Sequence, residues 1–190
     1  MANEKLLNFV QNFYKLLDEK PDEATIFKRG GDLLAKLVSK DDWLADSFAI
    51  PHPQFYQQYL LYADPQDLFS VVSFVWGPHQ KTPLHDHMTW GLIGTLRGQE
   101  KETSYHRRPD GGFEAGHTQI MSAGQVCSVS PSTHDIHEVS NNLEHETSIS
   151  IHVYGGNIGK IQRHVFDPVS GLEKSFISGY ANDLVPNLWK

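Results

Sequence analysis

Between about residue 54 and about residue 167, short β-prone runs alternate with turn signals, and this rhythm most limits how the chain can fold. The turns are Gly- or Pro-containing pairs and quartets, namely Asp64-Pro65, Gly77-Pro78, Arg97-Gly98, Pro109-Asp110-Gly111-Gly112 and Gly155-Gly156. The strand candidates between them are 55–61, 69–76, 83–87, 90–97, 99–106, 113–121, 125–130, 135–139, 146–154 and 160–166. Turns at roughly ten-residue intervals predict a β-sandwich or small β-barrel.

The segment before this region has helical periodicity. Apolar residues in 4–18 recur at spacings of three and four, which is the stripe of an amphipathic helix. A second helix is expected to start at Asp22 as N-cap and to run to about Leu37, with Gly30-Gly31 as a point where it bends or breaks. We therefore expect a mainly β fold with N-terminal α-helices packed outside the barrel.

The chain of 190 residues is long enough for one core, so we expect a single domain spanning 1–190. Within it, 1–52 form the helical segment, 53–167 the β-barrel core and 168–190 a C-terminal tail. The formal net charge of -7 argues against nucleic acid and anionic membranes as partners. There is no signal-peptide-like start and no apolar run of the ~20 residues that span a bilayer, so a cytoplasmic protein is expected.

The cysteine content fits the expected cytoplasmic location. Cys127 is the single cysteine, which excludes an internal disulfide. The simplest interpretation of Cys127 is a small buried apolar side chain.

The motif that carries chemistry is His85-Asp86-His87. Two histidines one residue apart point the same way on a β-strand, which makes a two-pronged metal chelate. With 11 histidines in the chain, however, such a pair alone is a weak signal. The case depends on the residues around it.

Those surrounding residues resemble the two motifs of the cupin superfamily. In chain order they are Gly77, His85-x-His87, Gly98, Gly124, Pro131, His137 and Asn141. The resemblance covers roughly 69–154 and implies a double-stranded β-helix, a small β-barrel in which His137 lies across from His85 and His87. His134 and His145 are alternatives for the third ligand, but the His-x-x-x-Asn spacing favours His137.

One departure from the cupin pattern has chemical meaning. The usual first motif also carries a glutamate ligand, and the corresponding positions here are Gly91 and Leu92. Three neutral imidazoles leave open positions on one face of a metal, which is what an Fe(II) oxygenase needs to hold a substrate and O2 together. Imidazole also suits Zn, Ni and Cu, so ligand type alone does not name the metal.

The segment 150–154 alternates strictly, with Ser150, His152 and Tyr154 on one face and two β-branched residues on the other. If the apolar face packs outward, the three polar groups face the barrel interior. They then form a relay from Ser150 through His152 to the Tyr154 hydroxyl beside the metal.

The whole pattern resembles the cysteine dioxygenase family of thiol dioxygenases. That family has His-x-His, a third His and then Ser-x-His-x-Tyr, which begins here thirteen residues after His137. The resemblance implies one Fe(II) per chain bound by His85, His87 and His137, with Ser150, His152 and Tyr154 as the outer relay. Many animal members crosslink a cysteine to the relay tyrosine, but Gly91 stands at the matching position and no crosslink is expected.

A second departure concerns the substrate. Animal members carry an arginine two residues after a tyrosine, and here Gln58 follows Tyr56 at that spacing, which leaves Arg163 as the candidate cation. Tyr56 could equally be a core residue, and Trp76 and Trp90 are expected in the core or pocket wall. The pattern resembles the bacterial branch that prefers 3-mercaptopropionate.

The resemblance therefore implies an iron enzyme that uses O2 to convert a small thiol, 3-mercaptopropionate, to 3-sulfinopropionate. The partners expected are this thiol and O2, with the protein a monomer or weak homo-oligomer. The alternatives are a cysteine dioxygenase that forms cysteine sulfinate, a Zn or Mn cupin that catalyses isomerisation or hydrolysis, and a non-catalytic cupin that binds a metal or ligand.

Overall fold

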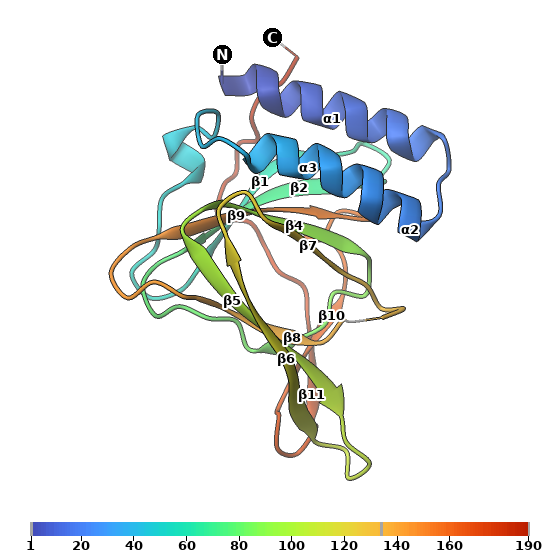
Figure 1. The fold of residues 1–190 in the computed structure, drawn as a ribbon, viewed down its shortest axis with the longest axis vertical. Helices are drawn as coiled ribbons and strands as arrows, with labels where there is room; N and C mark the ends of the chain where they lie inside the picture. Colours follow the sequence, from blue (N-terminus) through green and yellow to red (C-terminus); the bar gives the residue numbers. More distant parts are fainter. Residues whose placement is uncertain (1, 134, 190) are drawn as a thin grey trace.

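The computed structural model describes residues 2–133 and 135–189 of the chain, with side chains from residue 4 onward. Two antiparallel sheets face each other, and helices cover the outer face of one of them (Figure 1). In spatial order, the five-stranded sheet contains β1 (Gln57–Ala63), β2 (Ser70–Trp76), β9 (Ser148–Tyr154), β4 (Gly91–Arg97) and β7 (Val126–Val129). The six-stranded sheet contains β11 (Glu173–Phe176), β10 (Arg163–Phe166), β3 (Leu84–His85), β8 (His137–Asn141), β5 (Gln99–Arg107) and β6 (Phe113–Ser122). The mainly β fold with helices outside is as predicted.

The helical layer contains α1 (Ala2–Asp18), α2 (Glu23–Thr25), the π-helical segment Ile26–Gly30, α3 (Gly31–Val38) and a 3-10 turn at Asp46–Phe48. Asp22 is the N-cap of α2, since its Oδ1 accepts a hydrogen bond from the backbone N of Thr25 at 2.9 Å. The π-helical segment gives way to α3 at Gly30, where a Cβ would lie 2.9 Å from the Phe13 ring. None of the helices in the described part of the chain is both long and apolar enough to span a bilayer.

The central strand β9 is buried on both faces. Ile149, Ile151 and Val153 pack into the main core beneath the helices. Tyr154 belongs to a second cluster inside the barrel, so the polar residues of β9 point to the opposite side from its isoleucines. The predicted alternation therefore places the polar face in the barrel interior, between the two sheets.

The strand around the His-x-His motif is shorter than the predicted 83–87. It consists of Leu84–His85 alone, and His87 follows in a loop. Beyond the strand, the carboxylate of Asp86 accepts hydrogen bonds from the backbone N and the Nδ1 of His164 at 2.7 and 2.8 Å. Met88 then takes a left-handed conformation with φ of 57°. The position of His87 is thus set by side-chain contacts rather than by a strand ladder.

The tail contains a strand that the sequence pattern does not indicate. Strand β11 pairs with β10 so that Phe176 lies opposite Arg163. Its residues are mostly exposed, so there is no apolar alternation to reveal it. The tail thereby contributes a wall to the barrel mouth next to Arg163.

We expect Ile151→Ala to lower the free energy of unfolding by about 2–5 kcal/mol, because Ile151 is fully buried between sheet and helices. Ile120 on β6 is 52% exposed, and Ile120→Ala should change the free energy of unfolding by less than about 0.5 kcal/mol. Urea unfolding of both variants tests this. Equal losses in the two variants would contradict the placement of the core.

Candidate functional site

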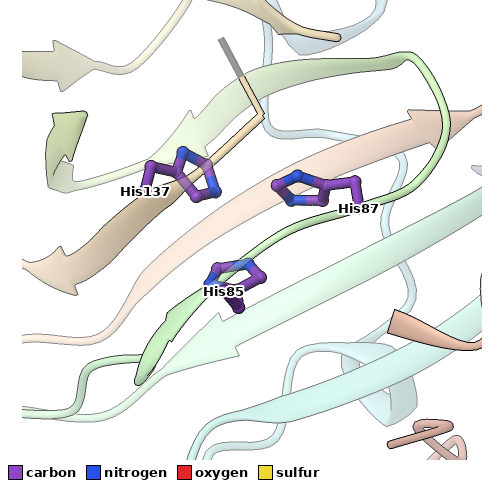
Figure 2. Close-up of side chains that lie close together, drawn as sticks. All are labelled: His85, His87 and His137. Atoms are coloured by element: carbon purple, nitrogen blue, oxygen red, sulfur yellow. The ribbon is translucent and has the colours of Figure 1, made fainter. Parts of the chain in front are cut away.

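Three histidines from separate segments converge inside the barrel (Figure 2). His85 comes from β3, His87 from the loop after it and His137 from the first position of β8. The register pairs His85 with His137, and each pair of rings has its centroids 4.8 Å apart. One ligand atom from each histidine lies within 4.8 Å of the others, so the group is arranged to hold a metal ion.

Each of the three histidines is oriented by an acceptor on its Nδ1. The pairs are His85 with the carbonyl of Pro83 at 3.0 Å, His87 with Oδ1 of Asp135 at 3.0 Å, and His137 with Oε1 of Glu102 at 2.7 Å. Since these acceptors require a proton on Nδ1, the lone pair of every ring is left on Nε2. A histidine that binds a metal commonly donates its other ring N–H in this way. The residues present therefore fit a metal ion.

The electrostatic surroundings also favour the neutral form of His85 and His87. Burial, followed by repulsion from His137 and His87, lowers the pKa of His85 well below its ordinary value. Burial and His137 do the same to the pKa of His87. Burial alone would raise the pKa of Glu102, but the hydrogen bond and charge of His137, together with hydrogen bonds from Gln119 and Cys127, outweigh it and lower that pKa to about 2. Neutral imidazoles backed by a carboxylate are good metal ligands.

The relay residues form a continuous hydrogen-bonded chain. Ser150 Oγ lies 2.8 Å from His152 Nε2, and His152 Nδ1 lies 2.8 Å from the Tyr154 hydroxyl. The Tyr154 ring stacks on His87 with centroids 5.8 Å apart, which places it beside the three histidines. A Cβ at Gly91 would lie 3.0 Å from the Tyr154 ring, so this glycine leaves room for the tyrosine.

Burial also fixes the ionisation of the relay. It lowers the pKa of His152 well below its ordinary value, with His87 and His137 acting in the same direction. It raises the pKa of Tyr154. Both groups are therefore neutral at neutral pH, and His152 carries a single ring proton.

A cavity of about 160 Å³ opens beside the three histidines. Arg163 and Gln58 both line it, as do Tyr56 and Trp76, whose rings stack with centroids 4.7 Å apart. Phe176, from the unpredicted strand β11, also lines it. No aspartate or glutamate of the described residues lines this cavity.

Arg163 is 3% exposed and incompletely paired. Its guanidinium lies 4.7 Å over the Phe176 ring and donates to Ser178, while its Nε has no partner in the described part of the chain. The Oε1 of Gln58 is likewise buried without a partner. Unpaired buried polar groups are costly, and a polar ligand in the cavity would satisfy them.

Of the two alternatives to His137 as third ligand, the structure describes only His145. His145 lies outside the site, because its side chain is 88% exposed. His134 lies outside the described residues.

Trp90 packs near Phe13 in the main core, with ring centroids 6.1 Å apart, rather than in the cavity.

Sequence reasoning missed the two carboxylates that orient the histidines. Asp135 gives no local signal, because it contacts His87, from which it is 48 residues distant in the sequence. Glu102 gives no such signal, because it reaches His137 only through the pairing of β5 with β8. Cys127 is partly buried, 3.8 Å from Glu102.

Comparison with known proteins adds family evidence. A family model described as cysteine dioxygenase type I matches residues 33–167. A protein with a double-stranded β-helix domain from Klebsiella pneumoniae is 18% identical, with a TM-score of 0.45 over 62% of this chain and 93% of that chain. A cupin superfamily protein from Desulfitobacterium hafniense is 11% identical, with a TM-score of 0.45 over 65% and 88%. An oxalate oxidase is 13% identical, with a TM-score of 0.43 over 55% and 53%. The residues that the family model matches include strands β1 to β10 of the two facing sheets.

We expect His137→Ala to lose most bound metal while the fold survives, because it removes one of three converging nitrogens. His145→Ala is the matched control and should keep its metal, since His145 is exposed. Metal content by mass spectrometry and far-UV circular dichroism measure the two effects. Full metal retention in His137→Ala would remove it from the ligand set.

Proposed function

We propose, from the premise that this chain belongs to the cysteine dioxygenase type I family, that it is a non-haem iron enzyme that oxidises a small thiol acid with O2. The preferred substrate in this proposal is 3-mercaptopropionate, and the product is 3-sulfinopropionate. Both oxygen atoms of O2 are transferred to sulfur, which is oxidised while O2 is reduced. The observation that carries the proposal is the cluster of three buried histidines, opening on a cavity that contains an incompletely paired arginine.

His85, His87 and His137 would hold the iron through Nε2. The chemistry that iron supplies when bound is Lewis-acid activation of the thiol and one-centre redox chemistry with O2. The protein fixes the geometry, because the acceptors at each Nδ1 prevent the rings from turning. The chain's own contribution is therefore orientation, charge and exclusion of water.

Tyr154 supplies a hydroxyl at the edge of the cavity. Its position is fixed by the hydrogen bond to His152, and Phe74 stacks on the His152 ring with centroids 4.0 Å apart. A hydroxyl fixed in this way can donate a hydrogen bond or a proton to the reacting groups without reorganisation. We assign Tyr154 this catalytic role, with His152 and Ser150 as the groups that orient it.

Arg163 is the proposed partner of the substrate carboxylate. A guanidinium can meet a carboxylate with two charge-assisted hydrogen bonds, and an arginine in a nearly closed cavity gains most from such a partner. Gln58 would add a neutral polar contact. The substrate carboxylate would thus satisfy groups that are otherwise left without partners.

The alternative substrate, L-cysteine, differs by an ammonium group. The unpaired Oε1 of Gln58 could accept a hydrogen bond from it. A neutral amide does not balance a buried positive charge, however, and Arg163 in the same cavity adds repulsion. The acid without an ammonium is therefore the better fit.

An isomerase or hydrolase would need a free general base beside the metal. No carboxylate of the described residues lines the cavity, and both ring nitrogens of His152 are engaged. A binding module without a metal would not explain why three Nε2 atoms converge. These observations favour the oxygenase over the Zn or Mn enzyme and over a metal-free binding module.

We expect kcat/KM to be highest for 3-mercaptopropionate, lower for cysteine and lowest for cysteamine, which has no carboxylate. Arg163→Ala should raise KM for the acid about 10–100-fold, the effect of losing hydrogen bonds to a charged group. Arg97→Ala is the control, because Arg97 is paired with Asp41 at the surface. Oxygen uptake measures kcat/KM for the three thiols and KM for the two variants. Equal kcat/KM for cysteine and the acid would sink the specificity proposal, and an unchanged KM would exclude Arg163.

Tyr154→Phe removes one donor and keeps the ring. We expect bound iron and thiol binding to persist while kcat falls about 10–1000-fold. Tyr62→Phe is the control, since that hydroxyl lies near Asp64 in another part of the fold. A wild-type rate in Tyr154→Phe, measured by sulfinate formation, would show that the hydroxyl has no catalytic role.

A further inference from the structure

The segment 173–182 connects the two sheets at the mouth of the barrel. It begins with β11, which pairs with β10 of the six-stranded sheet. Further on, the backbone N of Ala181 donates to the carbonyl of Gln58 at 2.8 Å, and the Asn182 side chain accepts from the N and donates to the O of Leu60 at 2.8 and 2.9 Å. Both of these partners lie on β1 of the five-stranded sheet. The red chain after β11 accordingly runs back towards the helical layer (Figure 1).

Between these two anchors, every second side chain faces the protein. Phe176, Ser178 and Tyr180 are partly buried, and the residues between them are exposed. The Tyr180 hydroxyl accepts a hydrogen bond from the backbone N of Gly159 at 2.8 Å and donates one to Oδ1 of Asn157 at 2.7 Å. Both partners belong to the loop between β9 and β10. Ser178 is therefore held in place from both sides.

Two of the inward-facing residues contact the guanidinium of Arg163. Ser178 Oγ accepts a hydrogen bond from Nη2 of Arg163. The Phe176 ring, opposite Arg163 in the register, has its centroid 4.7 Å from the guanidinium carbon. A hydrogen bond to one nitrogen and a ring against the central carbon restrict different motions of the side chain. The guanidinium is thus fixed at two points.

Neither contact neutralises Arg163. A hydroxyl group and an aromatic ring carry no net charge, so the positive charge stays available to an anion in the cavity. A carboxylate in place of Ser178 would instead compete with an anionic ligand. The Nε of Arg163 has no partner in the described part of the chain and is left for such a ligand. The segment therefore fixes the direction of the cation without using its charge.

The fixed guanidinium faces a fixed metal-binding group. His85, His87 and His137 line the same cavity as Arg163 and Phe176. In the proposed function, iron takes the thiol sulfur and Arg163 takes the carboxylate, so the carbon chain between these groups must match the space between two fixed points. Misplacement of reacting groups by about 1 Å can cost about 100-fold in rate. A rigid Arg163 therefore discriminates between acids that differ by one methylene group.

We propose that Phe176 and Ser178 are positioning residues that fix Arg163 and thereby select the thiol acid by the length of its carbon chain. The inference deepens the proposed function, because it rests on the binding of a carboxylate by Arg163. The preferred substrate class is a thiol with two methylene groups between sulfur and carboxylate. Strand β11 and the chain after it lie beyond residues 33–167, so these contacts are additional to the part that the family model matches.

Oxygen uptake by the iron-loaded enzyme with mercaptoacetate, 3-mercaptopropionate and 4-mercaptobutyrate tests the selection by length. In the wild type, kcat/KM for 3-mercaptopropionate should exceed that for the other two acids by about 10-fold or more. Ser178→Ala should lower this ratio about 3–10-fold, because it removes a hydrogen bond and lets the guanidinium follow acids of other lengths. Ser178→Thr keeps the hydroxyl and should restore the ratio.

Matched variants on the same segment separate positioning from a general loss of structure. Ser175→Ala should keep the wild-type ratio, because Ser175 is exposed and accepts a hydrogen bond from Gln162 at 3.3 Å, away from the cavity. Phe176→Leu should lower the ratio as Ser178→Ala does, while Ile177→Ala, at a side chain 58% exposed, should not. Ratios that stay unchanged in Ser178→Ala and Phe176→Leu, even if all rates fall together, would overturn the proposal.

A binding measurement without turnover observes Arg163 directly. 15N NMR follows its Nε–H in the full chain loaded with Zn²⁺, a diamagnetic ion that imidazole ligands accept, during titration with propionate, a carboxylate without a thiol. The wild type should show a rigid side chain whose signal shifts on titration. Ser178→Ala should show greater picosecond to nanosecond motion and about 10-fold weaker binding of propionate, with Ser175→Ala unchanged. An Arg163 side chain that is equally rigid in Ser178→Ala would contradict the proposal.

The two measurements distinguish failure of this proposal from failure of the proposed function. If the wild type consumes no O2 with any of the three acids, the proposed function fails, while the NMR titration still decides whether Phe176 and Ser178 position Arg163 for a carboxylate. If the wild type oxidises the acids but shows no preference for 3-mercaptopropionate over the shorter and longer ones, oxygenation of thiols stands and selection by length fails.

Discussion

The alternation of the central strand β9 is the constraint on which both halves of the molecule depend. Ile151 and its neighbours on the same face anchor the helical layer, while His152 and Tyr154 face the cavity. Because side chains change face at every residue, a register slip of one position would bury the relay under the helices and expose isoleucine to the site. Fold stability and site geometry are therefore set by the same seven-residue strand.

Neutral histidine rings lie next to the cavity, and carboxylates lie behind two of them. His87 and His137 are each backed by an acidic residue, Asp135 or Glu102, which fixes the tautomer and raises the basicity of the ligand nitrogen. Arg163 provides a cation in the cavity wall, where no described residue provides an anion. This distribution of charge suits a metal ion and an anionic substrate together.

The Ser150 to Tyr154 alternation was predictable from local sequence, because it is a strand pattern with fixed geometry. The His-x-His motif indicated the two histidines, but His87 lies in a loop where its backbone N donates to Asp135, which the strand pattern does not predict. The remaining contacts depend on pairing between distant segments. Glu102 meets His137 through the pairing of β5 with β8, and Phe176 meets Arg163 through a strand that has no apolar periodicity. Local spacing contains no information about such contacts, so only the structure reveals them.

The most direct test of the central claim is metal content measured together with thiol-dependent O2 consumption on protein purified without added metal. The account predicts about one iron ion per chain and O2 uptake that yields the sulfinate of 3-mercaptopropionate. Zinc-containing or metal-free protein that, even after loading with Fe(II), consumes no O2 with any small thiol would contradict it.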